Sequence, residues 1–397
     1  MEEFTTAHFF GALLLVCVFL MAGHLLKNIL FKRLIVPPSL IGGLIALGCG
    51  PQLLGGWLGK FLPDEWGLKG NLIAPEMVSI WKEMPAYWIT VVFAGLFLGS
   101  RIPKPRQIFN ESLPNLAFGY TLALGQYVVG MLIAALFLGP VFGVDVLSGA
   151  LIAIGFQGGH GTVAGLGNTF NDLGFSEGTD LGLGIATIGL ISAIVFGTVM
   201  SNLGRDNESG DLKLNHDERK RIEVTDVSFP LQMGILASTI AIAWIVLEGL
   251  VALESAILPE DSFRIFQYIP LFPVAMLCGL AVQVTARSLG WDSFISKYHI
   301  NAISNLALDL LIVAALGSLS LQALQKNASV VLILAGVGVA YNLTIYYGLA
   351  RYVFGEGWRV RGLGELGQSM GTTAIGLILI KQGSPKNADY VKAFSYK

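Results

Sequence analysis

The sequence predicts an all-α polytopic membrane protein with two inverted-topology repeats of about five transmembrane helices, each containing a re-entrant hairpin made from a broken helix. Three observations lead to this prediction. The composition is too apolar for a soluble protein, the apolar residues form separate runs long enough to cross a bilayer, and two further apolar stretches are interrupted by glycine and polar residues.

Composition sets the class of protein. Of 397 residues, 54% are hydrophobic and 13% are charged, against roughly a quarter charged in an average soluble domain. The mean hydropathy of +0.67 agrees, so we expect a lipid bilayer around the chain. A net charge of −2 lacks the concentrated cationic face that nucleic acid requires, which excludes that partner. The three cysteines lie far apart in apolar runs without metal-ligand spacing, and we predict no cofactor.

Nine runs satisfy the requirement of about 20 mostly apolar residues for a spanning helix. The first is predicted to be a retained helix and not a secretory signal, because acidic residues stand where a signal would carry basic ones and no small-residue cleavage site occurs before Lys27. The predicted spans are 8–30, 36–58, 84–100, 114–139, 181–203, 230–252, 265–286, 301–325 and 329–354.

A charged segment divides these spans into two sets. Between Arg205 and Asp226, twelve of twenty-two residues are Asp, Glu, Lys or Arg, so this segment cannot lie in the membrane. We therefore predict a first membrane repeat over residues 1–203, a cytoplasmic linker over 204–228 and a second membrane repeat over 229–397.

Two further apolar stretches, 147–168 and 362–381, read GFQGGHGTVAGLGN and GLGELGQSMGTTAIG at mid-length. Such sequences are poorly suited to a straight helix that faces lipid. Non-helical backbone at membrane depth is tolerated only where protein or a water-filled cavity supplies hydrogen-bond partners. Both stretches are therefore interpreted as re-entrant hairpins or broken helices.

Basic residues predict the orientation, because cytoplasmic loops are enriched in Lys and Arg. With the N-terminus outside, the cytoplasmic loops hold sixteen basic residues and the opposite loops hold five. The first interrupted stretch then enters from outside and the second from inside, each after four spans, so the halves are inverted. A short sequence repeat agrees with two related halves, since Gly161-Thr162-Val163-Ala164 resembles Gly371-Thr372-Thr373-Ala374.

The two halves differ at their ends. The first has a span, 181–203, after its interrupted stretch, whereas the chain ends soon after the second stretch. The last helix of the second repeat is apparently missing, and we expect either a truncated chain or an incomplete repeat.

Paired broken helices in inverted repeats are typical of secondary transporters with a site near the bilayer midplane. No Lys or Arg lies in the interior of the nine spans, away from their ends, so a small anion must be held by backbone N–H groups, hydroxyls, amides or His160. Glycine permits close approach of backbone to a ligand. The predicted substrate-binding residues are Gln157, Gly158, Gly159, His160, Gly161 and Thr162 in the first stretch, and Gln368, Ser369, Gly371, Thr372 and Thr373 in the second.

An acidic residue inside a span is costly and is a functional candidate by default. Asp309 lies in an apolar run, and Asn305 and Asn301 precede it at helical spacing on the same face. These three residues are predicted to ligate sodium or to meet a substrate ammonium group. Helix packing by a protonated Asp309 is the alternative. His160 is either a proton-linked group or a residue that orients the loop by hydrogen bonding.

The segment Gly158-Gly159-His160-Gly161-Thr162 resembles the first re-entrant loop of the glutamate–sodium symporter family. Val36-Pro37-Pro38 followed by Gly42-Gly43 is similar to that family's second helix, and 367–376 is similar to its second glycine-rich loop. The resemblance implies sodium-coupled import of glutamate, two inverted five-helix domains with re-entrant loops, a homodimer, and a place in the bacterial cytoplasmic (inner) membrane.

Three classes of function compete. The favoured one is a secondary active transporter with sodium as coupling ion and glutamate as substrate. A sodium- or proton-coupled carrier of another small carboxylate or amino acid, or an ion channel with re-entrant loops, remains the alternative. An intramembrane enzyme has little support, because Asp309 has no evident partner acid and no metal constellation occurs in the sequence.

Overall fold

The computed structural model describes residues 6–30, 36–61, 71–100, 105–203, 228–259, 262, 264–355, 357–383 and 394. These residues form helices and connecting turns, without a strand in the described ranges. Eight of the described helices are long and apolar enough to cross a membrane, so the chain is a multi-pass, all-α membrane protein. The predicted linker lies outside the described residues over 204–227, together with several basic residues used for the orientation.

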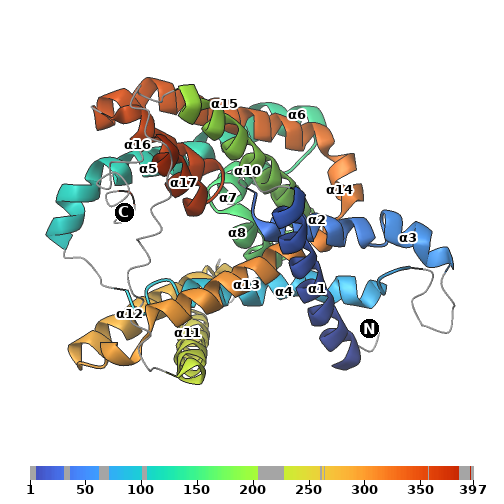
Figure 1. The fold of residues 1–397 in the computed structure, drawn as a ribbon, viewed down its shortest axis with the longest axis horizontal. Coiled ribbons are helices and arrows are strands. Elements are labelled where there is room, and N and C mark those ends of the chain that lie inside the picture. Colours follow the sequence, from blue (N-terminus) through green and yellow to red (C-terminus); the bar gives the residue numbers. More distant parts are fainter. Residues whose placement is uncertain are drawn as a thin grey trace. The chain divides into compact units, whose positions relative to one another are not determined.

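The chain folds into two compact units, each formed by residues from both halves of the sequence. Unit 1 comprises Met1–Arg101, Ala164–Ser176 and Glu223–Leu321, and unit 2 comprises Ile102–Val163, Glu177–Ile222 and Gln322–Lys397. Figure 1 shows the helices of both units coloured along the chain. The predicted division into repeats at residues 203 and 229 concerns the order along the chain and stays a prediction.

The helices of unit 1 come from all three of its segments. They are α1 (Thr6–Leu30), α2 (Pro38–Cys49), α3 (Leu54–Leu58), α4 (Pro75–Ala94), α9 (Gly167–Asp172), α11 (Phe229–Ile257), α12 (Leu271–Ser288) and α13 (Lys297–Gly317), with 3₁₀ turns at Gly59–Phe61, Phe266–Tyr268 and Asp292–Phe294. Proline stands at the first turn of α2, α4 and α11, where its missing N–H costs no hydrogen bond.

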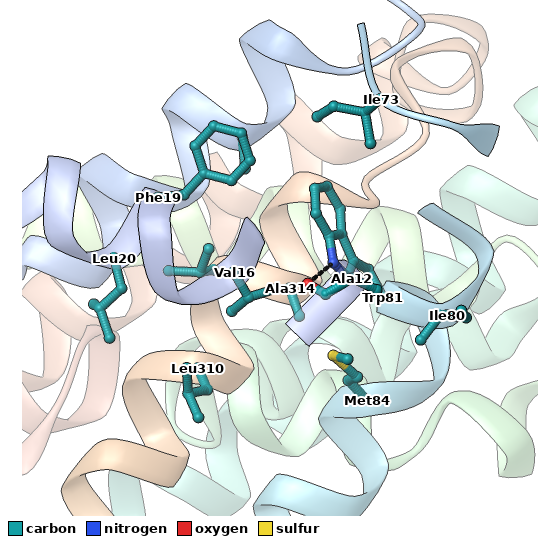
Figure 2. Packing of buried hydrophobic residues seen from close by; sticks show 12 residues of the cluster. Ala12, Val16, Phe19, Leu20, Ile73, Ile80, Trp81, Met84, Leu310 and Ala314 are labelled. Atoms are coloured by element: carbon teal, nitrogen blue, oxygen red, sulfur yellow. Dashed lines mark hydrogen bonds between the residues drawn. The ribbon is translucent and has the colours of Figure 1, made fainter. Parts of the chain in front are cut away.

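The centre of unit 1 is the pair α4 and α13, against which the other long helices pack. Trp81 of α4 is fully buried, and its indole N–H donates to the carbonyl oxygen of Ala12 in α1 at 2.9 Å. Phe19 meets the Trp81 ring edge to face at 6.0 Å between ring centroids. Figure 2 shows this cluster, which includes Leu310 and Ala314 from α13.

The helix contacts of unit 1 are symmetric between the two halves of the sequence: α1, α2 and α4 of the first half correspond to α11, α12 and α13 of the second. α1 packs on α2 as α11 packs on α12, α2 packs on α13 as α12 packs on α4, and α1 packs on α13 as α11 packs on α4. The buried hydrophobic clusters follow the same symmetry. One cluster joins α1 and α2 to α4 and α13. The other joins α11 and α12 to α4 and α13 or to residues that flank them.

Unit 2 contains the two interrupted stretches. Its helices are α5 (Pro105–Ile133), α6 (Gly139–Phe142), α7 (Leu151–Phe156), α8 (Gly159–Gly165, up to Val163), α10 (Gly178–Leu203), α14 (Leu321–Lys326, from Gln322), α15 (Ala328–Phe354), α16 (Trp358–Met370) and α17 (Thr373–Gly383), with a π turn at Ala134–Leu138 and a 3₁₀ turn at Val146–Ala150. α16 and α17 pack side by side (Figure 1).

An exposed ion pair lies at the start of α10. The carboxylate of Glu177 accepts hydrogen bonds from Lys326 Nζ at 3.0 Å and from Asn327 Nδ2 at 2.6 Å. The hydrogen bond from Lys326 is the main reason that the pKa of Glu177 lies below its usual value. The pair joins α10 to the turn between α14 and α15, although its exposure to solvent limits its contribution to stability.

The predicted spans agree with the helices except at three places. Span 301–325 is divided, because α13 ends at Gly317 and α14 begins at Leu321. Span 36–58 is divided into α2 and α3 around Gly50-Pro51. Span 84–100 belongs to a helix that begins nine residues earlier and ends at Ala94. That helix, α4, is not one of the eight apolar helices, and it carries Glu76, Lys82 and Glu83 in its first half.

Candidate functional site

The first interrupted stretch breaks between Phe156, the last residue of α7, and Gly159, the first residue of α8. The carbonyl oxygen of Ala153 accepts from the N–H groups of both Gln157 and Gly158, at 3.0 and 3.1 Å, which ends the helix. Gly159 then adopts φ +68°, a conformation that side chains with a β carbon rarely tolerate. The Thr162 hydroxyl donates to the Gly158 carbonyl at 2.9 Å and fixes the turn.

The second stretch breaks at Gly371 and Thr372, between α16 and α17. The N–H of Ile375 donates to Thr372 Oγ1 at 3.2 Å, so Thr372 caps the N-terminus of α17 in the manner preferred by threonine. The Gly161-Thr162 and Gly371-Thr372 pairs are therefore not in equivalent positions. The first pair lies inside α8, whereas the second is the break itself.

The two breaks meet inside unit 2. A β carbon added to Gly159 would lie 3.8 Å from the carbonyl oxygen of Gly371, which is ordinary van der Waals contact. Segments about 210 residues apart in sequence are thus brought together through their backbones. All eleven residues predicted to bind substrate belong to this unit and flank the two breaks.

Helix α10 packs along both broken helices and contacts α7, α16 and α17. Gly189 lies where the two breaks converge. A β carbon at this position would lie 2.5 Å from the ring of Phe156 and 2.8 Å from the carbonyl oxygen of Met370. Phe156 is the last residue of α7, and Met370 is the last residue of α16. Because Gly189 has no side chain, α10 can approach the C-terminal ends of both helices closely.

His160 is buried, with 6% of its surface exposed, and its Nε2 lies 3.0 Å from Thr187 Oγ1 on α10. The Thr187 hydroxyl donates its single proton to the carbonyl oxygen of Leu183 at 2.8 Å. The Thr187 oxygen must therefore accept from His160, which assigns the proton of the neutral imidazole to Nε2. This bond supports the interpretation that His160 orients the first break.

A buried polar cluster lies beside the second break. Gln126 of α5, Asn342 of α15 and Ser369 of α16 are each at most 1% exposed. Gln126 Nε2 donates to Asn342 Oδ1 at 3.1 Å and to the Ser369 carbonyl at 2.9 Å. The Ser369 hydroxyl donates to Asn342 Oδ1 at 2.8 Å, and Asn342 Nδ2 donates to the Gly338 carbonyl at 2.7 Å.

Acceptor oxygens without partners occur at both breaks. Gln157 Oε1 and Gln368 Oε1 are buried and have no hydrogen-bond partner among the described residues. A buried unpaired acceptor is costly unless a ligand completes it. These oxygens suit an ammonium group or another donor, whereas an anion requires the N–H groups and hydroxyls around the breaks.

The residues predicted for the coupling ion belong to unit 1. Asn301, Asn305 and Asp309 follow one another along one stripe of α13. The two asparagines are exposed and Asp309 is partly buried, whereas the opposite stripe of α13 is buried against α2 and α4. Among the described residues, no hydrogen bond or ion pair joins Asp309 to another side chain. The stripe is thus a polar face that unit 1 leaves uncovered.

The second interrupted stretch contains Glu365, to which the sequence interpretation gave no role, and Arg361 directly precedes that stretch. Glu365 of α16 is 1% exposed and accepts from Asn115 Nδ2 at 3.0 Å. Arg361 Nη2 donates to Asn115 Oδ1 at 2.8 Å. Arg361 precedes Gly371 by ten residues, about 15 Å along a helix, so its guanidinium group is not at the break.

Sequence interpretation also omitted Gln126 and Thr187 and gave Asn342 little weight. Each is a single polar residue in an apolar run. The signal was present, because a polar side chain at the middle of a span needs a buried partner. What the sequence did not contain was the identity of that partner.

One comparison with known proteins identifies the family. The model of the sodium/glutamate symporter family matches residues 88–377, a range that includes both broken helices, α10, α13 and α15. A search of curated proteins found no match. The family match confirms the resemblance that the glycine-rich motif indicated. Covering more than half of the chain, it shows that this protein belongs to the sodium/glutamate symporter family.

Proposed function

We propose that this protein is a secondary active transporter that imports glutamate across the cytoplasmic membrane together with sodium. The family is one of symporters and not of enzymes. The observation that carries the proposal is the convergence of two broken helices at Gly159 and Gly371 within unit 2. Broken helices at membrane depth present backbone groups to a solute where an intact helix presents none.

In this proposal the substrate lies at the two breaks of unit 2. Backbone N–H groups and the hydroxyls of Thr372 and Thr373 receive the carboxylates, and the glutamine oxygens receive the ammonium group. Thr162, whose hydroxyl donates to the Gly158 carbonyl, holds the first break in shape. No basic side chain is needed, because the dipole of α17 has its positive end at Thr373. Import of each additional positive charge gains about 2.3 kcal/mol per 100 mV of membrane potential.

Unit 1 carries the proposed coupling residues Asn301, Asn305 and Asp309. An uncovered carboxylate on an apolar helix is available to a cation or an ammonium group, and its cost in lipid argues for a functional role. We assign the stripe to cation coupling on this ground.

We further propose that the chain consists of two inverted repeats with re-entrant hairpins. The exchange symmetry of the helix packing in unit 1 supports it. So does the packing of unit 2, where α5 contacts α7 and α16 as α15 contacts α16 and α7. The excess of basic residues in alternate loops supports an outside N-terminus. Location in a bacterial inner membrane and assembly as a homodimer are proposed from the family alone.

Counterflow of labelled glutamate into liposomes that contain the purified protein tests the proposed function. With a sodium gradient, we expect accumulation above the external concentration, and without sodium we expect little. Accumulation driven by a proton gradient alone would reject sodium coupling. Equilibration that never exceeds the external concentration would indicate a channel, because a pore cannot concentrate a solute.

Replacing Thr162 with alanine is expected to lower glutamate uptake about fivefold or more. The change removes the hydrogen bond to the Gly158 carbonyl at the first break, and one such bond is worth about 1 kcal/mol. Thr344→Ala is the matched control, since its hydroxyl also donates to a carbonyl four residues earlier but lies exposed on α15. Initial uptake rates in proteoliposomes measure both. Equal rates for Thr162→Ala and wild type would reject the role of this threonine.

A further inference from the structure

The cluster of Gln126, Asn342 and Ser369 contains more acceptor oxygen than its donors satisfy. Both hydrogens of the Gln126 amide are used within the cluster, and the single hydrogen of the Ser369 hydroxyl goes either to Asn342 Oδ1 at 2.8 Å or to the Leu366 carbonyl at 3.1 Å. Gln126 Oε1 nevertheless has no partner among the described residues, although Gln126 is fully buried. A buried amide normally satisfies both ends, so this arrangement of the Gln126 amide is incomplete.

The amide of Gln126 has a second arrangement with a different chemistry. Rotating it by half a turn exchanges Oε1 and Nε2. The oxygen would then take the position from which the nitrogen reaches Asn342 Oδ1 at 3.1 Å and the Ser369 carbonyl at 2.9 Å. Three oxygens this close repel one another unless a cation lies between them. The same three groups therefore form either a hydrogen-bonded cluster or a cation site.

The surroundings favour a monovalent cation. Hard cations bind amide and carbonyl oxygens, and divalent ions in proteins usually require carboxylates as well. The cluster is built from neutral groups, and Ser369 stands in the last turn of α16, where the helix dipole is negative and the Ser369 carbonyl points to a side chain of another helix. Its helices α5, α15 and α16 all belong to unit 2.

We propose that a sodium ion binds among Gln126 Oε1, Asn342 Oδ1 and the Ser369 carbonyl. The inference rests on the proposed function, since it adds a sodium site in unit 2 to the coupling residues proposed in unit 1. It also supplies a route for coupling. Ser369 is two residues from Gly371, so an ion held there fixes the end of α16 and with it the second break. Substrate affinity then depends on sodium through the shape of this break.

Sodium binding is measured without substrate, by thermal unfolding of the purified, detergent-solubilised protein in sodium chloride and in potassium chloride at equal ionic strength. Wild type should gain thermal stability with sodium and not with potassium. In Gln126→Leu, the half-maximal sodium concentration should rise about tenfold or more. Gln232→Leu is the matched control, because Gln232 is equally buried but lies in unit 1 and uses both ends of its amide. It should keep the wild-type sodium response.

Gln126→Glu keeps the oxygens and adds a charge, so the half-maximal sodium concentration should fall. This variant keeps the inference testable if Gln126→Leu does not fold. A wild-type protein with no preference for sodium over potassium would overturn the site. So would a sodium response that is unchanged in Gln126→Leu, or in Gln126→Glu where Gln126→Leu does not fold.

The outcomes separate this inference from the proposed substrate. Sodium stabilisation that is lost in Gln126→Leu, together with absent glutamate counterflow, would keep the site and reject glutamate. Glutamate counterflow without sodium-specific stabilisation would keep the carrier and reject the site.

Discussion

Gly189→Ala is expected to abolish glutamate uptake in proteoliposomes, leaving less than about a tenth of the wild-type rate. The new methyl group would lie 2.8 Å from the Met370 carbonyl oxygen and 2.5 Å from the Phe156 ring. Overpacking of a tight site costs about 1–3 kcal/mol. Because a backbone carbonyl cannot rotate away as a side chain can, the ends of α7 and α16 must move apart. The distance between the two breaks then increases.

Two controls isolate this effect. Gly348→Ala on α15 has nothing within 4 Å of the added carbon, and it should transport normally. Gly197→Ala is on α10 itself, but the added carbon meets the side chain of Leu379, which can adjust. Uptake rates and unfolding temperatures are measured together for all three. Similar losses in Gly189→Ala and Gly197→Ala would mean that α10 packing in general, and not the breaks, is responsible.

Asp309→Asn is expected to lower sodium-driven uptake at least about tenfold, which corresponds to about 1.4 kcal/mol. The substitution preserves shape and removes the charge that the uncovered stripe of α13 offers to a cation. Glu248→Gln is the matched control, because Glu248 is an exposed acid on α11, another apolar helix of unit 1. It should stay within about twofold of wild type.

Initial rates are compared at several sodium concentrations for both variants. If Asp309→Asn shows wild-type rates and wild-type sodium dependence, the carboxylate has no role in coupling and the stripe is a packing feature. A protein that transports normally only with a proton gradient would instead move attention to proton coupling.

Local features of the sequence were sufficient for the helices and for the positions of the breaks. Apolar runs of the required length became helices, from α1 to α15, with shifts of a few residues at most ends. The glycine-rich segments became breaks, because Gly159 permits a positive φ and Thr372 caps a new helix. The same glycine motif identified the family before any contact was known.

The sequence was less informative about which residues of the two halves occupy equivalent positions, and about the surroundings of single charged residues. The G-T-x-A repeat suggested matching positions, yet one pair lies within a helix and the other forms the break. Glu365 stood within the second interrupted stretch and was passed over, although it is almost fully buried. Short motifs and single charges depend on their partners, and those lie up to 250 residues away.

The sequence alone determined the membrane class, the order of helices, the two breaks and the family. Only the tertiary structure decided that both breaks meet in one unit, that Gly189 lies against both, and that Gln126, Asn342 and Ser369 converge. The reason is physical. In a membrane protein the lipid is as apolar as the packed interior, so hydrophobic periodicity does not show which face of a span is buried. The partners of a polar side chain are therefore fixed by helix packing, which local sequence does not specify.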